Sequence, residues 1–241
     1  MFRDACESVA SEFVARPIDF TVEFEVQARL YEELRRRLAD IDALRTNGKH
    51  PSLTHTSDGY KRAYWTTIES KWRESDALTR VHPELTVQEN ERIDLAVLGE
   101  TVDAVEWHDG SKRFSASDLD AAFEVKYVKN KPRFPTTAAA SELAALSDDE
   151  LRDALDVEEN SLGPDFEELA RLPDDVETFL LLVSNKNYLY CPPVTEGERA
   201  HNRAYERLGR IAREWLTATG EAADTAVLYA TPRQYQWFVE P

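Results

Sequence analysis

Apolar residues return at helical spacing near the start of the chain. Within residues 21–39, Val26, Leu30, Leu34 and Leu38 recur at every fourth position. Residues four apart lie on the same face of a helix, so this segment predicts an amphipathic helix with one buried side. It is the first clear element along the chain.

Strand patterns follow in several places. Leu85–Glu89 and Glu91–Leu98 flank Asn90 and predict a hairpin, because two short strand-like runs are joined by a turn-forming residue. The other predicted strands lie around Val105 and at 121–129, 177–185 and 225–231. The last two are apolar throughout, which is typical of strands buried on both faces of a sheet.

Polar and helical segments connect these strands. Residues 47–59 predict a loop, residues 60–80 a short helix and residues 197–220 a long helix. Residues 130–175 are acidic, rich in Ala and Ser and interrupted by prolines, and they predict a mobile insertion. Together these elements predict a single α/β domain over residues 1–241, with a mixed central sheet flanked by helices.

The charge of the chain bears on its partners. The formal charge is −17 at pH 7, which taken alone disfavours nucleic acid, because phosphate binding normally uses a basic surface. The acidic residues are dispersed, however, and the basic ones are skewed to Arg, as in proteins from salt-saturated archaeal cytoplasm. At molar salt the Debye length is about 3 Å, so such a surface hardly repels a polyanion. We therefore interpret the charge as halophilic adaptation.

Cysteine usage and hydropathy predict the compartment. Cys6 and Cys191 are the only cysteines, and the N-terminal residues are acidic where a secretory signal would be apolar. No stretch approaches the roughly 18 consecutive apolar residues of a membrane helix. We expect a soluble, cytoplasmic protein with no membrane partner.

Charged side chains stand inside two predicted strands. Alternate residues of a strand face the same side, so Glu124 and Lys126 point together. Asp94 is the only acidic residue in the middle of an apolar strand, where a carboxylate needs a partner. If the strands are neighbours, two carboxylates and an ammonium converge. A divalent cation would relieve the repulsion between the carboxylates, and their hard oxygens suit Mg²⁺ or Mn²⁺.

An Asp in a hydrophobic strand, followed by Glu-x-Lys in the next core strand, resembles the PD-(D/E)xK nuclease superfamily. The resemblance covers about residues 20–190, with Ile93 in place of the proline of the motif name. Residues 23–31 are also similar to the first helix of nuclease domains in Type I restriction subunits and in stand-alone haloarchaeal relatives. The resemblance implies a restriction-endonuclease-like core with the element order αβββαβ.

The same resemblance implies roles for the residues of the two strands. Asp94 and Glu124 would bind Mg²⁺ or Mn²⁺, and the carbonyl of Val125 would add a ligand. Lys126 would orient the attacking water or help to deprotonate it.

The superfamily also places a glutamate on its first helix, and here Glu23 and Glu25 are the candidates. At about 100° per residue, Glu23 lies in the sector of the apolar face and Glu25 lies nearly opposite, toward solvent. Glu23 is therefore the fourth predicted site residue, acting through water.

These roles predict a metal-dependent endonuclease that hydrolyses phosphodiester bonds in DNA, although no motif separates DNA from RNA. A homodimer would suit cleavage of both strands. The alternative is a catalytically inactive nuclease-fold protein that binds nucleic acid or acts as a scaffold. Two further features keep two interpretations each. Residues 60–73 mix aromatic and basic side chains, which suits base stacking and helix packing equally. The arginines of 197–220 form either a basic stripe or a solvated face paired to nearby acids, and we favour the solvated face.

Overall fold

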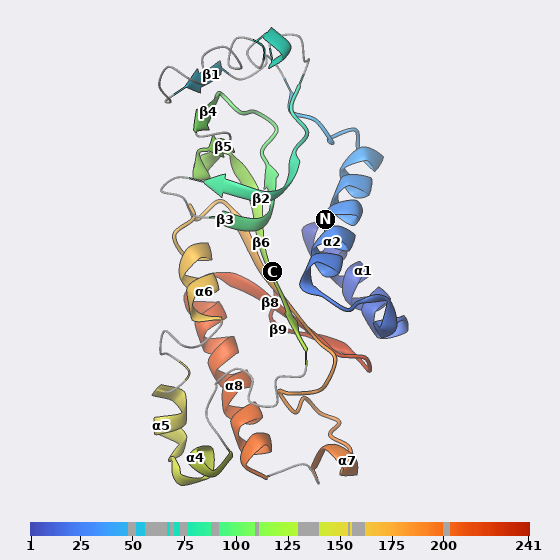
Figure 1. Cartoon of the computed structure of the whole chain (residues 1–241), viewed down its shortest axis with the longest axis vertical. Coiled ribbons are helices and arrows are strands. Elements are labelled where there is room, and N and C mark those ends of the chain that lie inside the picture. Colours follow the sequence, from blue (N-terminus) through green and yellow to red (C-terminus); the bar gives the residue numbers. More distant parts are fainter. Residues whose placement is uncertain are drawn as a thin grey trace.

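A computed structural model describes residues 1–47, 52–55, 67, 70–72, 77–87, 92–108, 111–129, 140–153, 155, 162–199 and 203–241. In these residues a sheet runs through an elongated molecule with helices on either side (Figure 1). The helices are α1 (Phe2–Ala15), η1 (Pro17–Asp19), α2 (Glu23–Asp40), η4 (Ala116–Asp118), α4 (Ala140–Ala145), α5 (Asp148–Asp153), α6 (Gly163–Leu169), α7 (Glu196–Arg199) and α8 (Arg203–Ala222).

The described strands form one mixed sheet in the order β1-β4-β5-β2-β3-β6-β7-β8-β9. The strands are β1 (Ser52–His55), β2 (Val81–Val87), β3 (Arg92–Leu98), β4 (Ala104–His108), β5 (Ser111–Phe114), β6 (Leu119–Val128), β7 (Glu177–Ser184), β8 (Thr225–Ala230) and β9 (Tyr235–Val239). At its centre, β2, β3 and β6 are antiparallel neighbours, and β7 and β8 continue parallel to β6. The parallel strands β7 and β8 are rich in apolar residues and are buried on both faces, as is typical of parallel strands covered by helices.

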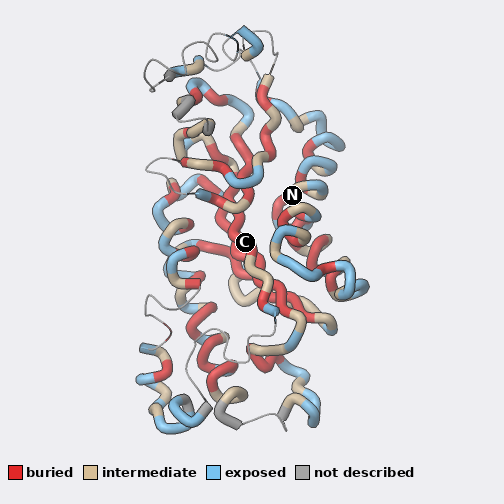
Figure 2. Tube along the Cα trace, viewed as in Figure 1, coloured by how far each residue is buried: buried red, intermediate tan, exposed pale blue. Residues whose placement is uncertain are grey.

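Alternation along β6 separates two apolar cores. Phe123 and Val125 pack with the apolar faces of α1 and α2, while the opposite face of the neighbouring strands packs with α6 and α8. Figure 2 shows the sheet as the most buried layer, with the exposed residues on the outer faces of the helices. Because Glu124 and Lys126 alternate with Phe123 and Val125, they point to the face that α6 and α8 cover.

Most of the predicted elements are present in the structure. The segment 21–39 is α2, and the hairpin is β2 and β3, with Leu85 opposite Ile93. The strands predicted around Val105 and at 121–129, 177–185 and 225–231 are β4, β6, β7 and β8. The prediction of an α/β fold with a mixed sheet flanked by helices is confirmed.

The prediction is wrong for residues 47–59, which were expected to form a loop and which include β1. Ser52 N–H donates to the Asp103 carbonyl at 2.9 Å, and β1 pairs parallel to β4. A four-residue strand at a sheet edge can be held by backbone bonds to one neighbour and needs no apolar alternation. The helix α1 and the strands β5 and β9 were not predicted from the sequence.

Three other segments are only partly comparable. Most of the helix predicted at 60–80, with its aromatic and basic side chains, lies outside the described residues. The long helix predicted at 197–220 is described as α7 and α8, and residues 200–202 between them are not described. In the segment 130–175, the described parts include α4, α5 and α6, and α6 contacts both β6 and β7.

Candidate active site

The ladder between β3 and β6 is interrupted by carboxylates. Its last pair in the direction of Lys126 is Leu95 with Phe123. Beyond that pair, Asp94 N–H donates to Glu124 Oε1 at 3.3 Å, and Val125 N–H donates to Asp94 Oδ2 at 3.0 Å. The two predicted acids therefore meet across the split between the strands, each held by a backbone amide of the other strand.

Glu124 is the most buried acid of this site, with 3% of its surface exposed. Burial, together with the charges of Asp94 and Asp165, raises the pKa of Glu124 to about 9. The backbone hydrogen bond from Asp94 and the ammonium of Lys126 act in the opposite direction but do not offset these effects. Without an added positive charge, the site holds more carboxylates than it can keep ionised.

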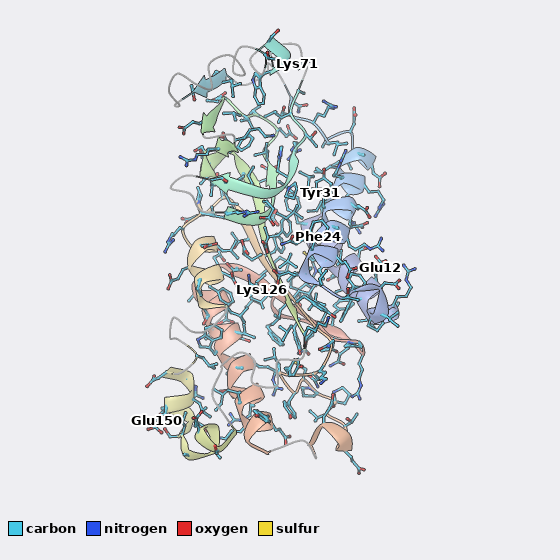
Figure 3. All side chains as sticks on the ribbon, in the orientation of Figure 1. Glu12, Phe24, Tyr31, Lys71, Lys126 and Glu150 are labelled. Atoms are coloured by element: carbon cyan, nitrogen blue, oxygen red, sulfur yellow. The ribbon has the colours of Figure 1, made fainter. Side chains whose placement is uncertain are left out.

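Lys126 lies beside Asp165, at the first turn of α6. The Lys126 Nζ to Asp165 Oδ1 distance is 3.1 Å. Burial acts to lower the pKa of Lys126, but Asp165, Glu23 and Glu124 outweigh it, so the pKa is raised and the ammonium form is favoured. Figure 3 places Lys126 near the middle of the molecule, where the sheet passes between the helices.

Asp165 was not among the predicted site residues. Burial raises its pKa to about 6, although Lys126 lowers it, and its Oδ2 atom is buried without a hydrogen-bond partner among the described residues. A buried oxygen of this kind calls for a ligand or a cation. In the sequence, Asp165 follows Pro164 within the acidic segment 130–175, and nothing in the local pattern distinguishes it from its many acidic neighbours.

Glu23 and Glu25 have different environments. Glu23 Oε2 accepts a hydrogen bond from Tyr127 N–H at 3.1 Å. Glu25 instead caps α2: it accepts from Thr21 N–H, from Thr21 Oγ1 at 3.0 Å and from Val22 N–H at 3.1 Å. The hydrogen bonds from Thr21 lower the pKa of Glu25. The structure thus brings Glu23, and not Glu25, to β6.

The backbone of β6 explains why Glu23 and Asp94 meet the same strand edge. In a strand, the N–H and C=O of one residue point to one side, and the next residue points to the other. Val125 N–H donates to Asp94 and Tyr127 N–H donates to Glu23, so the N–H groups of Val125 and Tyr127 both point to the β3 side of β6. The carbonyl of Val125 therefore faces the same side, beside the Asp94 carboxylate.

The donors at this site suit a hard divalent cation. No group of three or more His, Cys, Asp or Glu side chains in metal-ligand geometry occurs in the described part of the chain. The fit rests on the donor chemistry: carboxylate oxygens of Asp94 and Glu124, the Val125 carbonyl, and the unpartnered Oδ2 of Asp165 nearby. Hard oxygen donors with an unbalanced negative charge are what Mg²⁺ and Mn²⁺ prefer.

The basic face of the long helix does not contribute to this site. Arg207 and Arg210 bind Asp148, at 2.6 Å and 3.0 Å, and Arg213 donates to the carbonyls of Leu189 and Tyr190. Arg207 and Arg210 are thus paired to an acid, as was expected of this face, whereas Arg213 binds backbone carbonyls instead.

Comparisons with known proteins return nothing: no family model, no curated protein and no solved structure matches this chain. Among the described helices, none has both the length and the apolar character required to cross a membrane. We therefore infer the function from the residues of the site.

Proposed function

We propose that this chain is a metal-dependent endonuclease of the restriction-endonuclease-like fold, which hydrolyses phosphodiester bonds in DNA with Mg²⁺ or Mn²⁺. The observation that carries the proposal is the meeting of Asp94 and Glu124 across the β3–β6 split, with Lys126 on the same strand as Glu124. An excess of buried carboxylates next to a lysine has no evident structural purpose, and groups perturbed in this way cluster at functional sites.

The order of elements supports the fold assignment. With the intervening elements β1, β4, β5, η4, α4 and α5 left out, α2, β2, β3, β6, α6 and β7 follow one another in the order αβββαβ of the restriction-endonuclease-like core. Their three antiparallel strands are followed by one parallel strand. Three further elements, β1, β4 and β5, extend the sheet beyond β2. This is a topological likeness and concerns the scaffold only.

The residues would divide the work as follows. Asp94, Glu124 and the Val125 carbonyl would hold the cation, which when bound supplies positive charge to the phosphate oxygens of the substrate. Glu23, on the same edge of β6, would orient solvent in the split. Because the bound cation would offset the negative charge of the carboxylates, the site could bind the anionic phosphate of the substrate.

Lys126 would act as a hydrogen-bond donor. Asp165, Glu23 and Glu124 raise its pKa and favour the ammonium form. Of the two roles that the resemblance implies, we propose orientation of the attacking water, because the ammonium group is held at 3.1 Å from Asp165. Asp165, at 3.1 Å, would fix the direction of the ammonium group and is a positioning residue.

Nicking of supercoiled plasmid DNA in Mn²⁺ and molar KCl tests this function. Asp94→Ala and Lys126→Ala should each lose cleavage by at least about a hundredfold, because each removes a group that acts on the reacting phosphate. The matched controls are Asp103→Ala, at an exposed position, and Lys129→Ala, the exposed lysine just beyond β6. Both should cleave as the parent does.

Two results would decide against the proposal. Undiminished cleavage by Asp94→Ala or Lys126→Ala would show that the substituted residue has no catalytic role. A parent protein that binds DNA or RNA but cuts neither, with any divalent cation, would instead identify the inactive nucleic-acid-binding alternative.

A further inference from the structure

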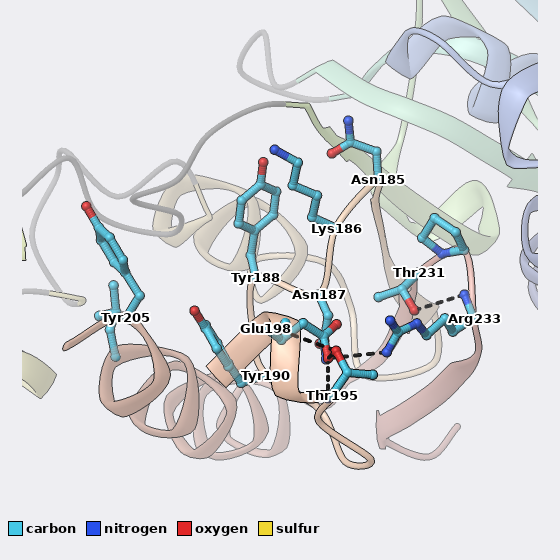
Figure 4. A pocket seen from close by; sticks show the side chains of 13 residues that line it. Asn185, Lys186, Asn187, Tyr188, Tyr190, Thr195, Glu198, Tyr205, Thr231 and Arg233 are labelled. Carbon is cyan, nitrogen blue, oxygen red and sulfur yellow. Dashed lines mark hydrogen bonds and ion pairs between the residues drawn. The ribbon is translucent and has the colours of Figure 1, made fainter. Parts of the chain in front are cut away.

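A second site lies at the carboxyl ends of the parallel strands β7 and β8. A cavity of about 430 Å³ opens there between the turn after β7, the start of α8 and the turn between β8 and β9. We call it the tyrosine pocket, because Tyr188, Tyr190 and Tyr205 line it (Figure 4). Ligand sites of parallel sheets occur at this end of the strands, and a volume of this size holds one small organic molecule.

The turn that forms one wall of the pocket is held rigidly. Ser184 Oγ and Tyr229 OH both donate to the Lys186 carbonyl, at 2.6 Å and 3.1 Å. Asn187 bonds the backbone of Cys191 twice: Oδ1 accepts from its N–H at 2.8 Å, and Nδ2 donates to its carbonyl at 3.0 Å. The side chains of this turn are therefore positioned before any ligand arrives, which lowers the entropy cost of binding.

Helix α8 fixes the same turn from the other side. A Cβ at Gly209 would come within 2.9 Å of both Leu189 and Tyr190, so only glycine permits this approach. Arg213, one turn further along, donates to the carbonyls of Leu189 and Tyr190. Tyr190 has a φ of 49°, a left-handed conformation that these contacts maintain. The pocket is a built feature of the fold.

The groups that face the pocket suit one class of ligand. The aromatic rings offer flat surfaces for stacking, and Figure 4 shows Lys186 next to Tyr188, with Asn185 on the other side of Lys186. Asn185 Oδ1 is buried, and no donor among the described residues reaches it. Lys186 is exposed at the rim. On the opposite wall, Arg233 forms an ion pair with Glu198 at 3.2 Å. Of the described basic residues that line the pocket, Lys186 is therefore the one available to bind an anion.

We propose that the tyrosine pocket binds the base of a nucleotide, with tyrosine rings against the heterocycle and Asn185 Oδ1 accepting a hydrogen bond from an exocyclic amino group. Aromatic side chains stack bases of any sequence, and an asparagine amide pairs with the amino-bearing edge of adenine. The phosphate of the nucleotide would lie toward Lys186. Bases with an amino group, such as adenine and cytosine, are favoured over thymine, which has none.

The pocket lies on the side of the sheet that α8 covers, because Tyr205 and Leu208 of α8 line it, and Lys126 points to the same side. Lys126 pairs with Leu182 in β7, and Asn185 lies just beyond the end of that strand, about 10 Å further at 3.3 Å per residue. Asn185 N–H also donates to the Val128 carbonyl at 3.3 Å, which ties the pocket wall to the end of β6. A nucleic-acid strand cut near Lys126 could place a neighbouring unpaired base in the pocket.

The inference rests on the proposed function only in its choice of a nucleotide among amino-bearing heterocycles, and turnover is not required. Its test is calorimetric titration of the Asp94→Asn protein in EDTA and molar KCl, where no cleavage occurs. The probes are deoxyadenosine, deoxycytidine and thymidine monophosphates in one arm, and the corresponding single-stranded tetranucleotides in the other. We expect the amino-bearing probes to bind at least about tenfold more tightly than the thymidine ones.

Variants assign the binding to the pocket. Tyr188→Ala should weaken the amino-bearing probes at least about tenfold, through lost stacking. Asn185→Leu, which keeps the side-chain size, should remove the preference over thymidine and gives an independent test if Tyr188→Ala fails to fold. Tyr31→Ala is the matched control, because Tyr31 is a half-buried tyrosine of α2, on the other face of the sheet, and it should bind as the parent does.

The outcomes separate the two proposals. Binding of either the mononucleotides or the tetranucleotides, with the expected dependence on Asn185 and Tyr188, supports the pocket, and the arm that binds identifies the source of the base. No binding in either arm, or binding that both variants leave unchanged, overturns it. A protein that binds these probes but never cuts DNA loses only the proposed nuclease function, and one that cuts without binding them loses only the pocket.

Discussion

Arg80 and Glu124 are equally buried, at 3% exposure each, but their surroundings differ. Arg80 donates to the Leu98 carbonyl at 2.7 Å, to the Ala43 carbonyl at 3.2 Å and to the carboxylate of Asp120. Its charge is balanced, and its hydrogen bonds join the end of β3 to the chain that follows α2.

Glu124 has the opposite surroundings. Its nearest charged neighbours include two further acids, Asp94 and Asp165, and its pKa is raised to about 9. A buried charge with complete partners holds a structure together, whereas a buried group surrounded by like charges weakens it unless a ligand is added. From this difference we infer a structural role for Arg80 and propose a ligand-dependent role for Glu124.

The largest effect that tests this comparison concerns Arg80. Arg80→Ala should lower the free energy of unfolding by about 3–5 kcal/mol, since it leaves buried carbonyls and Asp120 without their donor. Arg92→Ala is the control: Arg92 pairs with Glu84 at the surface, with 66% of its side chain exposed, and should lose less than about 1 kcal/mol. Urea unfolding in molar KCl measures both. Equal losses would mean that the burial of Arg80 contributes nothing.

A smaller effect of opposite sign is expected at Glu124. Because its folded pKa of about 9 lies above the unfolded value of 4.5, the folded state binds the extra proton between these pH values, and stability falls as pH rises through that window. Glu124→Gln mimics the protonated form. Without metal at pH 8, it should be about 1–3 kcal/mol more stable than the parent, and the gain should vanish near pH 4.

Metal gives the control for this prediction. Adding Mn²⁺ at pH 8 should raise the thermal midpoint of the parent and leave Glu124→Gln nearly unchanged, because ligand binding to the folded state stabilises it and the variant lacks a carboxylate ligand. Two results would contradict this prediction. The parent could be as stable as the variant at pH 8, or Mn²⁺ could raise the thermal midpoint of the variant as much as that of the parent. Either result would show that the folded state does not disfavour the ionised form of Glu124.

The same contrast explains how much could be predicted from sequence. Asp94 and Glu124 were found because each breaks a two-residue alternation that local backbone geometry imposes. The phase of α2 likewise separates Glu23 from Glu25, since the period of a helix is fixed. These signals are local, so one sequence suffices to read them.

The residues that were missed depend on packing between distant segments. Asp165 reaches Lys126 only because α6 docks on β6 and β7, and its own neighbourhood in the sequence is uniformly acidic. The tyrosine pocket is assembled from the turn after β7, from α8 and from the turn after β8, none of which carries a local motif. The pairing of β1 with β4 is a further tertiary choice that hydropathy does not encode.

The smallest effects separate the two glutamates at the start of α2. Glu25→Ala removes the cap of the helix, so it should lower the thermal midpoint slightly and leave plasmid cleavage unchanged. Glu23→Ala removes a group that faces β6, so it should reduce cleavage, by less than Asp94→Ala does, with little change in the midpoint. Measured side by side, Glu25→Ala should therefore change the thermal midpoint, and Glu23→Ala should change plasmid cleavage. If Glu25→Ala reduced cleavage and Glu23→Ala did not, the hydrogen bond from Tyr127 N–H to Glu23 would be structural only. The catalytic site would then not lie between β3 and β6.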